Sequence, residues 1–211
     1  MKKVCIVAVL ACLAICGHAQ IVTSRSSMIT RDSRNWSTFG VEYLPSSLKG
    51  DGGSVSFSGI AVNYTHAASI TQDFPLFFEY GIGAQFSFYS HKDGNYESKF
   101  NFLSLKVPAN IVYDIKVTDA NINIDPYIGL RLRGNVWGEI KETDFYGDTE
   151  KGNLFSSDEG GCKRLQVGWA VGIKARFNNA FFVGVGYGTD FNDFSDGVKI
   201  NEVSLSVGLV F

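Results

Sequence analysis

Cysteine is scarce in this chain, and three of its four cysteines, Cys5, Cys12 and Cys16, lie within the first 16 residues. If that segment is removed, Cys162 is left alone and an intramolecular disulfide framework is excluded. Proline is also rare, with 4 residues in 211. Basic residues are not in excess, since 19 Lys and Arg stand against 21 Asp and Glu. The chain therefore carries no basic footprint for nucleic acid, and we expect no nucleic-acid partner.

The first 19 residues predict export. Two lysines open the chain, an apolar stretch follows at 4–16, and Gly17 and Ala19 place small residues at positions −3 and −1 of a cut before Gln20. This is the pattern of a secretory signal peptide, and the stretch is too short for a stable membrane span. No later run is long and apolar enough for a spanning helix, so the strand pattern must decide the fold class.

A lipoprotein signal at Val9-Leu10-Ala11-Cys12 is an alternative, for which lipidation would be the test. The apolar run before Cys12 is short, so the cut before Gln20 is favoured. Removal of residues 1–19 takes the formal net charge from −2 to −4, because Lys2 and Lys3 are lost with no acidic residue. We expect a short periplasmic segment at 20–34 and one domain at 35–211.

Apolar and polar residues alternate with a period of two in eight segments, which predicts strands. The chain also contains 23 glycines, which suit curved, closed sheets better than helices. Most segments reach the 9–11 residues that a tilted strand needs to cross a bilayer. The alternation changes face near Ser58-Gly59, which predicts a β-bulge there. The eight segments are 36–44, 55–66, 76–89, 102–113, 124–140, 163–177, 181–187 and 202–211.

The connections between these segments alternate in length. Those at 68–75, 116–120 and 178–179 are short, whereas those at 48–53, 91–98, 141–162 and 190–198 are longer and polar. Short inner turns and longer outer loops are typical of outer-membrane barrels. The sequence therefore predicts an all-β fold, an eight-stranded antiparallel up-and-down transmembrane β-barrel with both ends in the periplasm.

Aromatic residues fall near both ends of the predicted strands, which is the pattern of two girdles at the membrane interfaces. The periplasmic girdle is predicted to contain Phe78, Tyr113, Phe177, Phe181 and Phe211. The outer girdle is predicted to contain Phe57, Phe88, Phe102, Trp137 and Tyr187.

A soluble barrel of lipocalin type would show the same period of two, with its apolar face inward. Against that alternative, the apolar faces are almost free of charge and the opposite faces carry charges of both signs. In a membrane barrel these charges point inward, where burial requires that they be paired. We predict an interior polar network that plugs the lumen, with Glu42 and Glu79 facing Arg131 and Arg133; a selectivity lining is the alternative. The network residues are Glu42, Glu79, Lys106, Asp114, Arg131, Arg133, Lys174, Arg176 and Glu202.

The last strand ends in Phe211, with Val207 and Leu209 at alternate positions before it, and resembles the insertion signal of outer-membrane barrels. The segments 103–113 and 125–129 resemble the porin-like outer membrane protein β-barrel domain family (PorT-like proteins), whose plan is similar to OmpX and the OmpA barrel. The resemblance implies the outer membrane of a Gram-negative bacterium, contact with the lipid bilayer and lipopolysaccharide, and assembly by the barrel-assembly machinery through Phe211. It implies little about activity, because fold does not carry function.

Catalysis has weak support. His91, with Ser90 and Asp93, is the one plausible cluster for modifying lipid A, whereas His66 lies toward the wrong leaflet. We expect no catalytic residue, no metal and no cofactor.

The outer loops offer another role. Their carboxylates, at 142–159 and 190–196, suit calcium or a basic partner but match no EF-hand spacing. Tyr146, Phe155, Phe191 and Phe194 are candidate contacts for an adhesin or an unknown extracellular ligand, and Cys162 is assigned no role. The favoured function is structural or surface interaction; the alternatives are a small or gated pore and a lipid A-modifying enzyme.

Overall fold

The computed structural model describes residues 35–50, 53–71, 74–94, 96–117, 121–156 and 161–211. By contacts the chain divides into two units, Met1–Ser33 and Arg34–Phe211. The expected signal peptide and the segment 20–34 lie outside the described residues. The described residues contain no helix that is long and apolar enough to cross a membrane.

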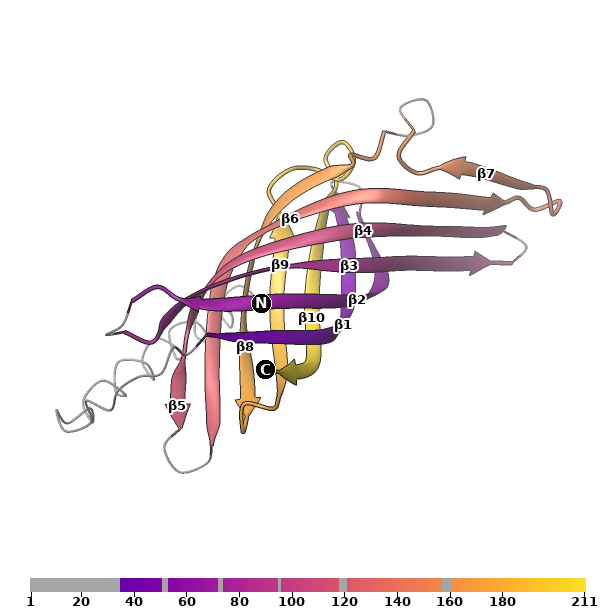
Figure 1. Ribbon diagram of the computed structural model, residues 1–211. Helices are drawn as coiled ribbons and strands as arrows, with labels where there is room; N and C mark the ends of the chain where they lie inside the picture. Colours follow the sequence, from indigo (N-terminus) through magenta and orange to yellow (C-terminus); the bar gives the residue numbers. More distant parts are fainter. Residues whose placement is uncertain (1–34, 51–52, 72–73, 95, 118–120, 157–160) are drawn as a thin grey trace, which may run out of the picture. The chain divides into compact units, whose positions relative to one another are not determined.

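Eight antiparallel strands form a closed hydrogen-bonded ring, as predicted (Figure 1). Each strand pairs with the next in the chain, and the ring closes where β1 pairs with β10 from Thr38↔Val210 to Lys49↔Lys199. Two short strands, β5 (Ile115–Val117) and β7 (Thr149–Asn153), pair with β6. The ring strands are β1 (Trp36–Gly50), β2 (Gly53–Ser69), β3 (Leu76–Asp93), β4 (Tyr96–Tyr113), β6 (Ile122–Thr143), β8 (Leu165–Phe177), β9 (Phe181–Asp190) and β10 (Lys199–Val210).

The outward face of the ring is apolar. In β10, for example, Val203, Leu205, Val207 and Leu209 are all exposed, while Glu202 beside them is buried. A soluble barrel would show the reverse arrangement, because its apolar face must leave water. We call the end at which β1 begins and β10 ends the inner end, and the opposite end the outer end.

Glycine makes room for large side chains inside the ring. A Cβ atom at Gly186 of β9 would lie 2.3 Å from the hydroxyl of Tyr127, and one at Gly188 would lie 3.1 Å from the guanidinium carbon of Arg131. The inner face of β9 is therefore glycine-rich because β6 fills the space in front of it.

All ring strands except β8 are longer than the sequence predicted, and β3, β4 and β6 extend past their neighbours. The pairing of β2 with β3 ends at Ser58↔Phe88, and that of β6 with β8 ends at Gly134↔Leu165. Beyond these points β3, β4 and β6 continue together and are joined by β7 (Figure 1). We call this four-stranded extension, formed by residues 89–93, 96–101, 138–143 and 149–153, the outer sheet. The predicted loop at 91–98 is thus largely strand, and the one at 141–162 contains the end of β6 and all of β7.

The predicted β-bulge is misplaced. Residues around Ser58-Gly59 pair with both neighbours in unbroken register, so β2 does not change face. The register shifts in β6 instead, where Leu103 pairs with Trp137 but Ser104 pairs with Asn135. Val136 is the extra residue, and both Val136 and Trp137 are 47% exposed. The prediction failed because Phe57, an aromatic residue at the outer end, faces inward. An apolar residue at an inward position gives the same sequence pattern as a strand that changes face.

Candidate functional site

The interior of the ring is crossed by ion pairs at successive levels. At the inner end, Arg176 of β8 lies between two carboxylates: its Nη2 is 3.1 Å from Asp114 Oδ1, and it also binds Asp125 of β6. The guanidinium lies over the ring of Trp36, 3.8 Å from its centroid. A cation over an aromatic face adds to the attraction of the carboxylates, so Arg176 holds the beginning of β1 against β8.

The middle level joins β8 to β3 and β4 to β1. Lys174 Nζ lies 2.6 Å from Glu79 Oε2, and Asn110 donates to Glu79 Oε1 at 2.8 Å. Lys106 Nζ donates to Glu42 Oε2 at 3.0 Å. Each carboxylate at this level therefore has a cationic partner from a strand that is not its neighbour.

The outer level contains two arginines of β6 and two carboxylates. Arg131 Nη1 donates to Glu202 Oε1 at 2.6 Å, and its Nη2 lies 3.4 Å from Asp190 Oδ1. Arg133 is fully buried, and its Nη2 lies 3.6 Å from an oxygen of both Asp190 and Glu202. Gln85 completes the group by donating to Glu202 Oε2 at 3.0 Å. The formal charges of this level cancel.

All nine side chains predicted for the interior network form ion pairs inside the ring, but the predicted partners were wrong. Glu42 pairs with Lys106 and Glu79 with Lys174, whereas Arg131 and Arg133 face Glu202 and Asp190. Partners across a lumen depend on the tilt and stagger of the strands, which no short sequence pattern records. Asp190 was assigned to an acidic loop, although it continues the inward positions Gly184, Gly186 and Gly188 of β9.

Two apolar clusters lie inside the ring, one toward each end, and the inner one packs against Arg176. The inner apolar cluster contains Trp36, Ala67, Phe77, Val112, Phe182 and Val210. The outer apolar cluster contains Phe57, Phe100, Phe102, Phe155, Phe194 and Ile200.

The outer apolar cluster corrects four expectations. Phe57 and Phe102, predicted for the outer girdle, are 5% and 0% exposed and point inward. Phe155 and Phe194, predicted as ligand contacts, are also buried, because loop segments fold over the end of the ring. The other girdle residues lie on the outward face: Phe78, Phe88, Trp137, Phe181, Tyr187 and Phe211 are exposed, and Tyr113 and Phe177 are half-buried.

The predicted catalytic cluster is not assembled. His91 is exposed on the outer sheet and stacks on Tyr89, and Ser90, the preceding residue of the strand, points to the other face. Asp93 is on the same face as His91, but no hydrogen bond joins the two in the described part of the chain. At the inner end, Nδ1 of His66 lies 3.0 Å from Ser37 Oγ. The described residues contain no group of His, Cys, Asp or Glu that could hold a metal ion.

Cys162 is half-buried against the outer apolar cluster. Burial raises the pKa of its thiol, partly offset by a hydrogen bond with Ser195. A thiol in such surroundings reacts slowly, because the thiolate is the reactive form.

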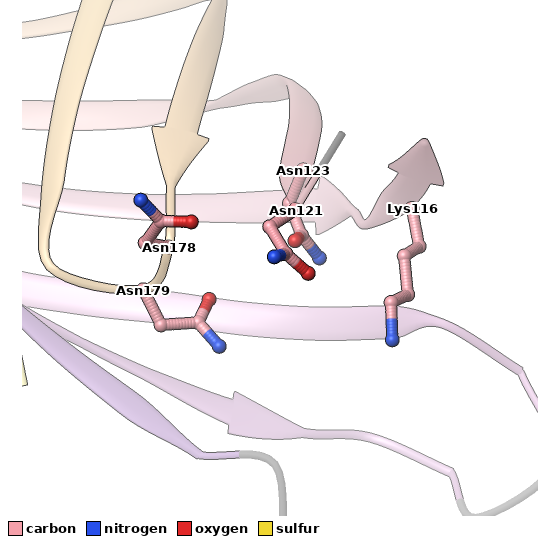
Figure 2. Close-up of a pocket in the computed structure, with 5 residues that line it drawn as sticks. All are labelled: Lys116, Asn121, Asn123, Asn178 and Asn179. Carbon is pink, nitrogen blue, oxygen red and sulfur yellow. The ribbon is translucent and has the colours of Figure 1, made fainter. Parts of the chain in front are cut away.

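Two hollows open on the surface. One, of about 360 Å³, lies among the inner turns and is lined by Lys116, Asn121, Asn123, Asn178 and Asn179 (Figure 2). Asn121, Asn178 and Asn179 have φ of 49°, 52° and 50°, a conformation that asparagine tolerates better than most residues. These asparagines are therefore explained by their turns.

The second hollow, of about 290 Å³, lies at the tip of the outer sheet and is lined by Lys92, Glu97, Thr143, Phe145, Tyr146 and Gly147. Phe145 and Tyr146 are 70% and 90% exposed and meet edge to face. Asp144, counted among the candidate calcium ligands, accepts the backbone N–H groups of Tyr146 and Asp148 at 2.9 Å and so fixes the turn. A hydrogen bond from Lys99 lowers the pKa of Glu97.

Comparisons with known proteins agree with this architecture. The crystal structure of Ail, the attachment invasion locus protein of Yersinia pestis, in complex with the heparin analogue sucrose octasulfate is similar at 14% identity, with a TM-score of 0.51 over 84% of this chain and 99% of that one. Neisserial surface protein A gives 14% identity and a TM-score of 0.48, over 84% and 97%. None of the curated proteins compared with this chain matches it. The model of the outer membrane protein beta-barrel domain matches residues 47–196, and the chain belongs to this family of bacterial outer-membrane proteins.

Proposed function

We propose that this barrel is a surface-interaction protein whose lumen is closed and whose outer sheet contacts an extracellular ligand. The observation that carries the proposal is the filling of the lumen: charges that cancel at the outer level lie between two apolar clusters. An eight-stranded barrel is just wide enough for side chains to fill it. A lumen filled in this way supports an activity that lies outside the lumen.

The tip of the outer sheet is the best candidate contact. Phe145 and Tyr146 form an exposed aromatic pair beside Lys92 and Glu97, in the hollow described above. Rigid aromatic side chains with nearby polar groups are typical of binding sites. Hydrogen bonds to Asp144 fix the turn that carries the pair, which lowers the entropy lost on binding.

The test uses the barrel in lipid nanodiscs against a panel of immobilised polysaccharides and extracellular-matrix proteins. Heparin belongs in the panel because the similar Ail structure contains a heparin analogue. We expect Phe145→Ser with Tyr146→Ser to abolish binding to the panel member that the parent barrel retains. Phe191→Ser, at an exposed aromatic residue of another outer loop, is the matched control. Binding that survives the double change, or no binding by the parent, would contradict the proposal.

A gated pore is the second candidate, and one observation favours it. Phe155 and Phe194 close the outer end from loop segments rather than from ring strands, so a loop movement would remove them together. Conductance in planar bilayers separates the two functions. A steady open state of the parent barrel would overturn the closed-lumen proposal.

We further propose that the barrel is not an enzyme. Ser98 lies directly opposite His91, and Glu142 lies directly opposite Ser98, on the same face of the outer sheet. No hydrogen bond joins these three side chains in the described part of the chain, and the ring of His91 stacks on Tyr89 instead. Mass spectra of lipid A from cells that lack or overproduce the protein should be identical. A change in acyl-chain number would refute this.

Export and assembly complete the proposal. We propose cleavage before Gln20, which N-terminal sequencing of the membrane-inserted protein tests, and recognition of the strand ending in Phe211 by the barrel-assembly machinery. Deletion of Phe211 should slow insertion in cells while leaving refolding into detergent unchanged.

A further inference from the structure

Three lysines form a row across the outward face of the outer sheet. Lys99 of β4 pairs directly with Lys141 of β6, and Lys141 pairs directly with Lys151 of β7. Residues directly opposite in antiparallel strands point to the same face, with Cβ atoms about 4.5–5.5 Å apart. We call Lys99, Lys141 and Lys151 the lysine row.

The lysine row continues the lipid-facing surface of the barrel. Its neighbours one position along, Phe100 and Ile140, belong to the outer apolar cluster or pack against it, so they lie on the inward face. The lysines therefore share the outward face with Phe88 and Trp137, which are exposed below them.

Like charges placed directly opposite one another destabilise a sheet, and this row is only partly neutralised. Lys99 Nζ lies 2.7 Å from Glu97 and Lys141 Nζ lies 2.9 Å from Glu139, whereas Lys151 makes no ion pair within the described part of the chain. The row therefore keeps a net positive charge, which is concentrated at the Lys151 end.

The height of the row suits a lipid headgroup. Lys141 is four residues beyond Trp137, about 13 Å along the strand at 3.3 Å per residue. A strand tilted by about 45° converts this to roughly 9 Å along the membrane normal. Exposed aromatic residues mark the boundary of the hydrocarbon, and the polar region of one leaflet is about 5–8 Å thick. The backbone of the row therefore lies just beyond the polar region, and lysine side chains that bend back toward the membrane reach the phosphate groups of outer-leaflet lipid.

We propose that the lysine row binds the phosphate groups of lipopolysaccharide in the outer leaflet and holds the outer sheet at the membrane surface. Each basic side chain beside an anionic lipid surface changes affinity about fivefold, so three change it by on the order of 100-fold.

The test titrates the refolded barrel, in zwitterionic detergent micelles, with lipid A that carries both phosphates and with dephosphorylated lipid A, by calorimetry. We expect Lys99→Gln, Lys141→Gln and Lys151→Gln together to weaken binding of phosphorylated lipid A by about 100-fold, while the triple arginine variant keeps it. Lys116→Gln, which removes an exposed lysine at the inner end, is the matched control and should change nothing. Heat-modifiable electrophoresis confirms that each variant is folded.

Three outcomes would overturn the proposal: equal affinity for dephosphorylated lipid A, an unchanged triple glutamine variant, or tighter binding of soluble heparin than of lipid A through the same lysines. Saturation by inorganic phosphate alone at millimolar concentration would also count against a lipid site. Loss of ligand binding at Phe145 and Tyr146 affects none of these readouts, so the two proposals fail separately.

Discussion

Replacement of Glu202 by glutamine tests the charge balance inside the barrel. Glu202 Oε1 accepts from Arg131 at 2.6 Å, and its Oε2 lies 3.6 Å from Arg133. Glutamine keeps the volume of the side chain and removes one negative charge. Two arginines are then left facing Asp190 alone, and the outer level carries a net positive charge.

The expected loss of stability follows from the separation of the charges. Two unit charges about 4 Å apart attract by about 4 kcal/mol at an effective dielectric constant near 20. Removal of one partner from a buried pair costs about 3–5 kcal/mol in measured cases, because the remaining charge stays buried. Because whole domains are stable by only about 5–15 kcal/mol, Glu202→Gln should remove a large fraction of the free energy of unfolding.

Urea unfolding of the barrel refolded into phosphatidylcholine vesicles, followed by tryptophan fluorescence, measures this loss. The control is Glu42→Gln, because the side chain of Glu42 is 24% exposed and pairs with Lys106 alone, so its loss should cost less. Addition of Arg133→Gln to Glu202→Gln restores the charge balance and should recover part of the stability. A loss below about 1 kcal/mol for Glu202→Gln, or no recovery in the double variant, would refute the argument.

Two further changes probe the packing of the lumen. Gly186→Val should destabilise the barrel by about 1–3 kcal/mol in the same assay, because its Cβ would lie 2.3 Å from the hydroxyl of Tyr127; Gly134→Val, with no atom within 4 Å, is the control. Phe194→Ala should open the outer apolar cluster and speed maleimide labelling of Cys162, whereas labelling of the parent should be slow at neutral pH and rise with pH, because burial raises the pKa of the thiol. Equal labelling rates would show that Phe194 does not shield Cys162.

The sequence predicts the ring well because the lipid imposes a rule on every residue of a strand. An outward side chain that touches lipid must be apolar, so Val203, Leu205, Val207 and Leu209 stand out against Glu202 and the small residues between them. The same rule explains why charges on the other face could be assigned to the interior before any contact was known.

The rule fails where the chain leaves the lipid. In the outer sheet the outward positions hold Lys99, Lys141 and Lys151. Charged outward residues then alternate with inward residues of mixed polarity, so the sequence resembles a loop. Inside the ring, an aromatic residue satisfies both interior and interface, so Phe57 and Phe102 were assigned to a girdle although they pack against each other, 5.9 Å between ring centroids. Both errors concern contacts made by three-dimensional register, which a period of two does not encode.

The outer sheet has two proposed contacts, one with lipid and one with an extracellular ligand, at different heights on the same strands. The lysine row lies near the membrane, whereas Phe145 and Tyr146 lie at the hairpin between β6 and β7, beyond Lys141 and Lys151. A strand pair that reaches past its neighbours loses their hydrogen bonds, so something else must order it. The outer apolar cluster orders its inward face, and lipid bound along the lysine row would order its outward face. A sheet ordered on both faces presents its tip with less entropy to lose, which is the condition under which a small aromatic contact binds measurably.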